Sequence, residues 1–126
     1  MKKVFMAIGG LIALFVLVFG VVMGTTFSGL KPMPDGQDLP GGSRRVNHSY
    51  TSAYLVPTGE KEFALIDCND DPEAVAIKAE LQRRGVGPEA VKAIFLTHGH
   101  PDHTGGCKVF PGAQVFIADG EQGLVE

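Results

Sequence analysis

The sequence predicts an α/β domain that follows an N-terminal transmembrane helix, and three observations support this fold class. Residues 4–24 form an uncharged apolar run of about the length that a helix needs to cross a bilayer. Farther along the chain, short runs of β-forming residues alternate with one amphipathic helical pattern, which is typical of a sheet covered by helices. A histidine-rich segment then follows one of these apolar runs, as ligand sites follow strand ends in such sheets.

The size and charge of the chain narrow the classes of function. Its 126 residues correspond to roughly one small domain. The net charge is −3, and the cationic side chains of the first half are scattered rather than massed. The sequence therefore has no basic patch that would predict a nucleic-acid partner. Nothing in the sequence points to an oligomeric state.

The apolar run is preceded by Lys2 and Lys3 and ends in Val-Val-Met-Gly. A signal peptide has the same basic start, but its apolar region is usually about 7–15 residues long and ends in small residues. We therefore favour an uncleaved membrane anchor at residues 4–24, with a cleaved signal peptide or a buried helix as alternatives. Positive charge stays on the cytoplasmic side. The domain is thus expected on the exported, periplasmic or extracellular, side, or to be secreted if the signal is cleaved.

Residues 25–49 are rich in glycine, proline, serine and aspartate, which break any regular period. We expect a Gly/Pro-rich linker here, between an anchor or signal at residues 1–24 and a domain at residues 50–126. His48 lies at the end of this linker, far from the other histidines. A lone histidine of this kind is expected to be a surface or packing residue.

Residues 50–56 and 61–67 predict a β-hairpin. Both segments are rich in β-formers, and the Pro-Thr-Gly-Glu sequence between them supplies turn residues. Residues 63–66 are almost continuously apolar. This pattern indicates a strand that is covered on both faces.

The next segment predicts a helix that begins after Asp70 or Asp71 and runs to about Arg84. Either aspartate can accept hydrogen bonds from the free amides of the first turn. The expected apolar face consists of Ala74, Ile77 and Leu81. Gly85 is expected to end the helix.

The remaining elements are short. We expect a turn at residues 88–91, a buried strand at 93–96, a loop that contains the histidines, a strand at 113–118 and a further helix from residue 119. The resulting order is strand, strand, helix, strand, loop, strand.

Residues 97–106 read THGHPDHTGG and hold three of the four histidines. His98 and His100 are two positions apart, so in an extended loop they can point the same way. Asp102 and His103 follow directly and can face a different point. Imidazole and carboxylate are zinc ligands, and four donors divided two and two suit two metal ions. We attribute backbone freedom behind these ligands to Gly105 and Gly106.

A loose histidine-rich tract is the alternative interpretation, because such tracts also bind metal. The histidines here are separated by glycine, proline and aspartate, and they follow an apolar strand. The sequence therefore predicts a built metal site.

The motif H-G-H-P-D-H, after an apolar strand and before T-G-G, resembles the metal-binding motif of the metallo-β-lactamase-fold hydrolases. Upstream, SAYLV, ALID, a helix and AIFLTHGHPDHTGG are similar to the order of elements that leads to this motif in the superfamily. The resemblance implies an α/β (α+β) domain at residues 50–126 that forms the N-terminal half of an αββα sandwich. It also implies roles for residues of the motif. His98 and His100 would bind a first metal, Asp102 and His103 a second, and Asp67 would orient the histidine loop by hydrogen bonds.

The chemistry that the resemblance implies is hydrolysis of a small-molecule ester, thioester, lactone or amide by a metal-bound hydroxide. One or two Zn²⁺ ions are expected, with iron or manganese as alternatives. Asp102 would be catalytic, because it would help to orient or deprotonate the water. Thr97 and Thr104 are expected to form loop hydrogen bonds rather than to act as nucleophiles. The motif is slightly more similar to the glyoxalase II-like and lactonase-like branches.

One departure from the family pattern concerns the missing ligands. The family has a third histidine for the first metal, a bridging aspartate and a final histidine well downstream, whereas no histidine follows His103 here. We therefore expect the domain to be incomplete at its C-terminus, as in a fragment of a longer chain. A non-catalytic metal-binding module and an inactive truncated remnant are the alternatives.

Cys68 and Cys107 are the two cysteines of the chain. Their spacing matches no zinc-finger pattern. In an exported protein they could form a disulfide. We favour two separate thiols, because the sequence does not indicate that their Cα atoms lie within disulfide reach.

Overall fold

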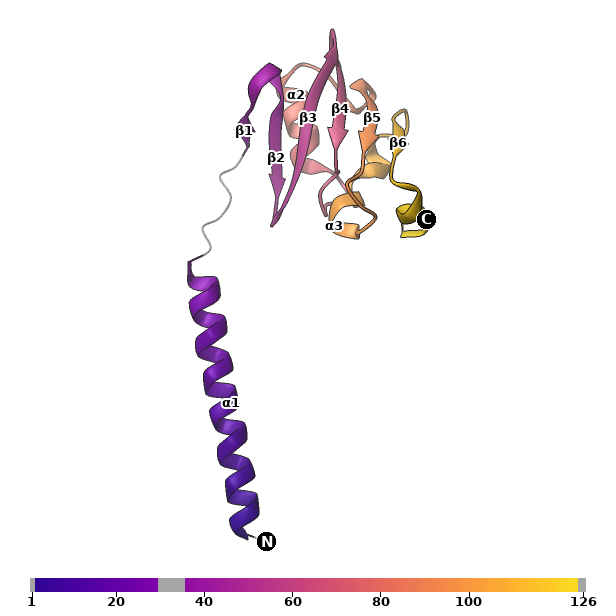
Figure 1. Ribbon diagram of the computed structural model, residues 1–126. Helices are drawn as coiled ribbons and strands as arrows, with labels where there is room; N and C mark the ends of the chain where they lie inside the picture. Colours follow the sequence, from indigo (N-terminus) through magenta and orange to yellow (C-terminus); the bar gives the residue numbers. More distant parts are fainter. Residues whose placement is uncertain (1, 30–35, 125–126) are drawn as a thin grey trace. The chain divides into compact units, whose positions relative to one another are not determined.

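The chain divides into two units, Met1–Pro32 and Met33–Glu126. The computed structural model describes residues 2–29 and 36–124, and its helices and strands are labelled in Figure 1. In the described residues, the first unit contains helix α1 and the second contains the sheet.

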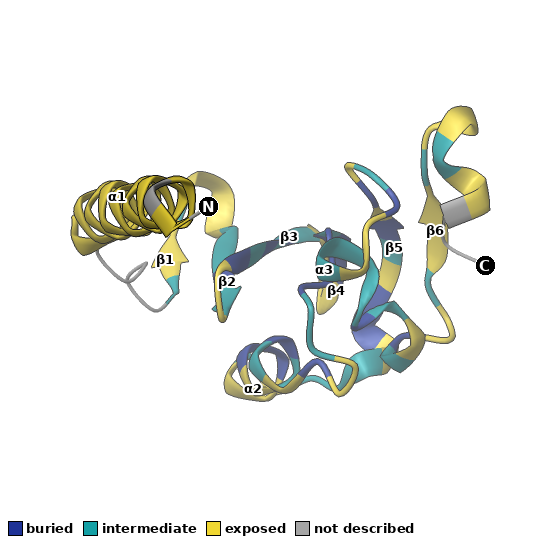
Figure 2. Cartoon of the chain, turned by 90° about the horizontal axis from the view of Figure 1, so that it is seen from below, coloured by how far each residue is buried: buried dark blue, intermediate teal, exposed yellow. Residues whose placement is uncertain are grey.

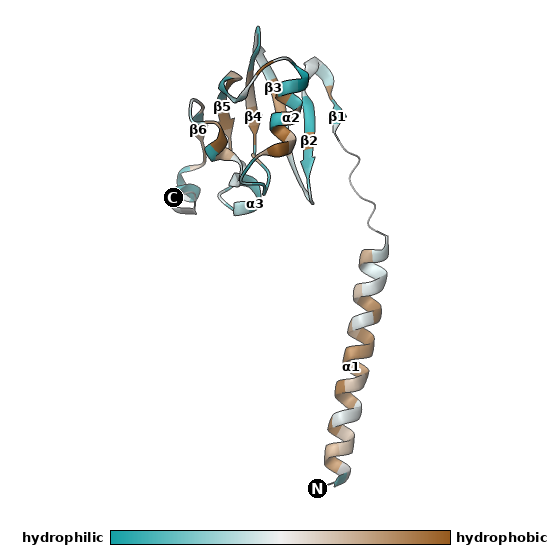
Figure 3. Ribbon diagram, turned by 180° about the vertical axis from the view of Figure 1, so that it is seen from behind, coloured by the Kyte–Doolittle hydropathy of each residue, from teal (hydrophilic) through white to brown (hydrophobic). Residues whose placement is uncertain are grey.

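Helix α1 (Lys2–Ser28) makes up the described part of the first unit. Its segment Val4–Ser28 is long and apolar enough to cross a membrane, with a mean hydropathy of 2.8 and no part of that window buried. Apolar side chains occur all around it, as the brown ribbon of Figure 3 indicates. A helix that is apolar on every side is not a surface helix of a soluble domain. A signal peptide meets the same criterion, so a membrane anchor at this helix stays a prediction.

The second unit is built on a mixed six-stranded sheet with the strand order β1-β2-β3-β4-β5-β6. The first four strands pair antiparallel, and β4, β5 and β6 pair parallel. The strands are β1 (Gln37–Asp38), β2 (Arg44–His48), β3 (Thr51–Gly59), β4 (Glu62–Ile66), β5 (Val91–Phe95) and β6 (Gln114–Phe116). The predicted α/β class is confirmed.

The prediction of an irregular segment at residues 25–49 is wrong in part, and its residues 30–35 lie outside those that the structure describes. Helix α1 continues to Ser28, and β1 and β2 join the sheet within this segment. Strand β2 pairs along its whole length with β3, from Arg44 opposite Leu55 to His48 opposite Thr51. Only Val46 of β2 is buried. Pairing with β3 therefore makes this polar segment a strand, and its own composition carries little strand signal.

The predicted hairpin is present as β3 and β4. Tyr54 lies opposite Ile66, and Val56 lies opposite Ala64. Three consecutive residues of β4, Phe63 to Leu65, are buried. Ile66, the last residue of the strand, is only partly buried, so the prediction that this strand is covered on both faces holds only in part.

Helix α2 (Val75–Arg83) connects β4 to β5 and begins four residues after Asp71, later than predicted, because Pro72 and Glu73 lie in a turn and Ala74 occupies the N-cap position. The Asp71 carboxylate accepts hydrogen bonds from the amides of Glu73 at 3.0 Å and Val75 at 2.8 Å. Figure 2 shows α2 on one side of the sheet, with its buried residues toward the strands. The buried apolar residues of this segment are Ala74, Ile77 and Leu81, as predicted. Gly85 ends the helix with a φ of 74°.

The prediction of a fully buried strand at residues 93–96 needs a correction. Strand β5 alternates between buried and exposed positions, and Phe95 keeps 47% of its surface exposed. Its ring stacks on that of Phe116, opposite it on β6, with 4.9 Å between the ring centroids. Helix α2 covers one face of the sheet, and among residues 36–124 no helix covers the face with these two rings (Figures 1 and 3).

Candidate metal centre

The histidine motif lies at the carboxyl edge of the parallel strands, directly after β5. His98 and His100 belong to an extended loop, and the short helix α3 (Pro101–Thr104) follows. Pro101 occupies the first helical position, where its missing amide has no cost. Asp102 and His103 therefore stand on a helical turn, while the first two histidines stand on the loop before it. Figure 1 shows α3 at the end of the sheet to which β4 and β5 point.

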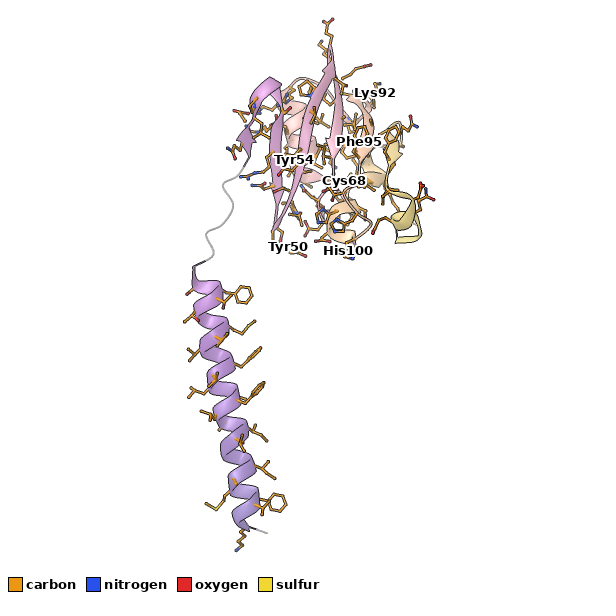
Figure 4. The ribbon with its side chains drawn as sticks, in the orientation of Figure 1. Tyr50, Tyr54, Cys68, Lys92, Phe95 and His100 are labelled. Carbon is orange, nitrogen blue, oxygen red and sulfur yellow. The ribbon has the colours of Figure 1, made fainter. Side chains whose placement is uncertain are left out.

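His98, His100 and Asp102 form a group of metal-type side chains. One ligand atom from each lies within 4.8 Å of the others, and no second group of three or more is found among the residues that the structure describes. The rings of His98 and His100 are nearly perpendicular, with centroids 4.7 Å apart. Figure 4 shows His100 beside α3. Two imidazoles and a carboxylate are donors that Zn²⁺ accepts, so the group fits this ion.

His103 lies next to this group but is not a member of it. Its ring centroid is 4.0 Å from that of His98. Its Nε2 is 3.7 Å from Oδ2 of Asp102. The structure thus brings all four predicted ligands to one place. It groups Asp102 with the first two histidines, whereas the resemblance pairs Asp102 with His103.

Asp67 lies behind these residues at the end of β4 and is 4% exposed. Its carboxylate accepts hydrogen bonds from the amide of Thr97 at 2.9 Å and from the hydroxyl of the same residue at 2.9 and 3.1 Å. Nδ1 of His103 lies 2.9 Å from Oδ2 of Asp67. One buried carboxylate therefore contacts both the start of the motif and its last histidine.

These contacts determine the positions of two protons. A carboxylate only accepts hydrogen bonds, so the ring of His103 donates from Nδ1–H, and in the neutral imidazole the lone pair is on Nε2. The Thr97 hydroxyl donates to Asp67, which leaves its oxygen to accept from Nδ1 of His98 at 3.1 Å. His98 then also has its free lone pair on Nε2. In both histidines the nitrogen that Asp67 or Thr97 does not contact is the one available to a metal.

Residues 46–123 match the family model of the metallo-beta-lactamase superfamily. The chain belongs to this superfamily. Its sheet, with α2 on one face and the histidine motif at the carboxyl edge of β5, is thus part of a metallo-beta-lactamase fold.

Solved structures of metallo-beta-lactamases are similar to the chain. The subclass B3 enzyme MEM-A1 from a soil metagenome library is 28% identical, with a TM-score of 0.62 over 75% of this chain and 36% of that one. BJP-1 of Bradyrhizobium japonicum, also subclass B3, is 26% identical, with a TM-score of 0.62 over 73% and 36%. The Rm3 enzyme is 31% identical, with a TM-score of 0.60 over 71% and 34%.

The chain spans about a third of the length of these metallo-beta-lactamases. No curated protein matches the chain. The matches do not distinguish the glyoxalase II-like or lactonase-like branch of the superfamily from its other branches.

Gly105 and Gly106 bring α3 of this metallo-beta-lactamase fold close to the loop after β4. Both residues have ordinary negative φ angles, −51° and −86°. A Cβ on Gly105 would lie 2.8 Å from the carbonyl carbon of Asp70, and one on Gly106 would lie 2.6 Å from the carbonyl oxygen of Cys68. The expectation that they supply backbone freedom is therefore wrong. These two positions require glycine because two backbone segments are in close contact here.

His48 contacts the same loop, which the sequence did not predict. Its Nδ1 lies 2.7 Å from Oδ1 of Asp70, which also accepts a hydrogen bond from the Thr51 hydroxyl at 3.2 Å. The contact with the Asp70 carboxylate raises the pKa of His48, and the contact with His48 lowers the pKa of Asp70. No local pattern at His48 indicated its partner, because 22 residues separate the two.

Glu121 is a second contact that the sequence did not indicate. Its Oε2 accepts a hydrogen bond from the amide of Gly99 at 3.1 Å. Gly99 lies between the two histidines of the loop. The turn that follows β6 (Asp119–Leu124) therefore also contacts the backbone of the motif.

Proposed function

We propose that this chain forms part of the active site of a metal-dependent hydrolase of the metallo-beta-lactamase superfamily. The observation that carries the proposal is the group of His98, His100 and Asp102, whose ligand atoms lie within 4.8 Å of one another. In the proposal these three side chains and His103 bind one or two Zn²⁺ ions, with iron or manganese as alternatives.

The zinc, when bound, supplies a Lewis acid that polarises a carbonyl and lowers the pKa of water toward neutrality. The substrate class that we propose is a small molecule with an ester, thioester, lactone or amide carbonyl. The three solved structures named above are metallo-beta-lactamases, which supports an amide of this kind among the candidates.

The side chains of this chain have separate tasks in the proposal. Asp102, with a third of its side chain exposed (34%), accepts a hydrogen bond from the attacking water and takes up its proton. Asp67 is a positioning residue, because its contacts with Thr97 and His103 fix ring orientation and proton position. His98 and His100 bind metal through nitrogen lone pairs.

The location of the domain is also a proposal. The length and apolar composition of α1 support a membrane anchor, and Lys2 and Lys3 before its apolar segment support a cytoplasmic N-terminus with the domain on the exported side. A cleaved signal peptide and secretion remain the alternative. We propose that the hydrolase domain comprises residues 50–126 together with the preceding strands β1 and β2, since β2 pairs fully with β3.

The test uses the full chain in detergent. Zinc content is measured after equilibration with Zn²⁺ and desalting, and hydrolysis is measured with thioester, lactone and β-lactam probes. We expect about one or two zinc ions per chain, and loss of at least one in His100→Ala. His48→Gln is the matched control, because His48 is the histidine outside the motif, and it should bind zinc as the wild type does.

Three outcomes separate the alternatives. Turnover that His100→Ala abolishes supports the hydrolase. Zinc binding without turnover of any probe contradicts it and favours the non-catalytic metal-binding module. A chain that binds no zinc and shows no cooperative unfolding contradicts both and favours the inactive remnant.

A further inference from the structure

Cys68 and Cys107 lie together at the junction between the loop after β4 and the segment after α3. Their Sγ atoms are 2.6 Å apart, although 39 residues separate them in sequence. Cys68 is fully buried and Cys107 is partly exposed. Neither cysteine belongs to the group of metal-type side chains found in the described part of the chain.

The backbone independently holds these two segments together. The amide of Cys68 donates to the carbonyl of His103 at 2.7 Å. A Cβ on Gly106, the residue before Cys107, would lie 2.6 Å from the carbonyl oxygen of Cys68. A disulfide needs Cα atoms about 4.4–6.8 Å apart and side chains that point toward each other. The two segments are in backbone contact and the Sγ atoms are 2.6 Å apart, so the two side chains point toward each other as a disulfide needs.

We propose that Cys68 and Cys107 are an oxidation site and form an intramolecular disulfide in the mature protein. The bond joins the residue after Asp67 to the segment that follows His103. It therefore closes a loop that contains α2, β5 and the whole histidine motif. The expectation of two separate thiols is replaced by this proposal, and the exported location proposed above supplies an oxidising compartment.

The chemistry needs a disulfide oxidant, such as the disulfide of a dithiol oxidoreductase or oxidised glutathione. The Cys107 thiolate, which is the more accessible, attacks one oxidant sulfur, and the oxidant leaves as one thiolate with Cys107 in a mixed disulfide. The Cys68 thiolate then attacks Sγ of Cys107 and expels the second oxidant thiolate. Two cysteine thiols are oxidised, one oxidant disulfide is reduced to two thiols, and two protons pass from the cysteines to the products.

The two cysteines also lie close in sequence to residues of the proposed metal centre. Asp67 precedes Cys68, and Asp102 and His103 lie within five residues of Cys107. A covalent bond here limits the separation of Asp67 from His103, which are 2.9 Å apart. This consequence for metal binding rests on the proposed function, whereas the disulfide itself does not.

The experiment follows the thiols of the full chain in detergent, freed of metal with a chelator. The protein is reduced, transferred to oxidised glutathione, quenched with acid, denatured and alkylated with iodoacetamide. Tryptic digestion without reductant separates peptide 62–78, which holds Cys68, from peptide 93–108, which holds Cys107. We expect the two peptides joined as one linked species, no alkylated cysteine, and recovery of both alkylated peptides after treatment with dithiothreitol.

Controls show whether the fold creates the site. Cys68→Ala and Cys107→Ala should each keep one thiol that is alkylated or carries glutathione. The same reaction in urea should form the linked peptides at least about tenfold more slowly, because the unfolded chain no longer holds the sulfurs together.

Several results would overturn the proposal. These are alkylation of both thiols after oxidation of the folded chain, a stable glutathione adduct on Cys107, links between chains rather than within one, and equal rates in folded and unfolded protein. Because the chain is free of metal throughout, none of these results depends on zinc binding or hydrolysis. The experiment therefore distinguishes failure of the disulfide proposal from failure of the hydrolase proposal.

Discussion

Oδ2 of Asp67 lies 2.9 Å from Nδ1 of His103, although 36 residues separate them in the sequence. This contact joins the end of β4 to α3 and so couples the sheet to the last predicted ligand. A second contact of the same carboxylate, with Thr97, couples it to the first residue of the motif. One buried carboxyl group thus contributes two contacts to the orientation of the histidine loop.

Replacement of Asp67 tests this dependence. Asp67→Asn has nearly the same shape, but its amide nitrogen cannot accept hydrogen bonds from Thr97 and His103. We expect zinc affinity to fall about 10–100-fold and the free energy of unfolding to fall by about 1–3 kcal/mol. Zinc competition with a chromophoric chelator and chemical denaturation measure the two quantities. Thr97→Ser keeps the hydroxyl and is the control, and an Asp67→Asn protein with unchanged zinc affinity would remove the positioning role.

Zinc itself should stabilise the fold. A ligand that binds only the folded state adds about 2.7 kcal/mol to the free energy of unfolding at a concentration of 100 times its Kd. We expect this increase for the wild type with added Zn²⁺ and its loss with a chelator, measured by thermal denaturation. In His100→Ala the effect should shrink, and an identical zinc response in that variant would be inconsistent with His100 as a ligand.

Close contact at Gly106 should make this position intolerant of a side chain. The Cβ of Gly106→Ala would lie 2.6 Å from a backbone oxygen that cannot rotate away. We expect a loss of about 1–3 kcal/mol in the free energy of unfolding, as in other overpacked sites. Gly112→Ala is the matched control, because a Cβ there meets nothing within 4 Å. Equal stability of the two variants in urea denaturation would show that the loop after β4 moves to accept the new Cβ without loss of unfolding free energy.

The pair of His48 and Asp70 predicts a small pH dependence of stability. The folded pKa of His48 is raised, so its contribution is complete below the unfolded value of 6.5 and is lost as pH rises through the folded value. The folded pKa of Asp70 is lowered, so its contribution is present above 3.8 and is lost as pH falls through its folded value. Both groups are partly exposed, and the pair is worth less than about 1 kcal/mol.

We therefore expect the wild type to lose some stability, relative to His48→Gln, between pH 5.5 and pH 8.5. Urea denaturation at the two pH values gives the difference, and the ring resonances of His48 give its pKa directly. A His48 pKa at or below 6.5 would contradict the structure at this pair.

The disulfide, once formed, should stabilise the folded chain. Closing a loop of this length restricts the unfolded state by about 3–4 kcal/mol in the chain-entropy model. We expect a higher Tm for the oxidised than for the reduced protein in scanning calorimetry. Cys107→Ala should show one Tm under both conditions, and a lower Tm of the oxidised wild type would indicate that the bond distorts the fold.

Elements with a strong local pattern were predicted correctly from the sequence. The apolar face of α2, the hydrogen bonds of the Asp71 carboxylate to amides near its start and its end at Gly85 depend on neighbouring residues, and so does the hairpin of β3 and β4. Strand β2 was missed, because its sequence is polar and only its pairing with β3 makes it a strand.

The candidate site also has one part that the sequence predicted and another that it did not. The spacing of His98, His100, Asp102 and His103 indicated a metal site, and the structure brings these side chains together. Other contacts around the site join distant segments of the chain, as those of His48 with Asp70 and of Gly99 with Glu121 do. No local periodicity or spacing encodes such contacts, so sequence reasoning could not supply them.

The parallel pairing of β4 with β5 has a consequence for the order of folding. β2, β3 and β4 are joined by short turns, so their contacts close small loops and can form early. β5 reaches β4 only after the chain has passed through α2, and that larger loop is costlier to close. The histidine motif begins where β5 ends, so its approach to Asp67 belongs to this later event. We therefore expect a nascent chain with a formed hairpin to present its histidines on a loop that still lacks the contacts of Thr97 and His103 with Asp67, and these contacts to form only after the last strands have docked.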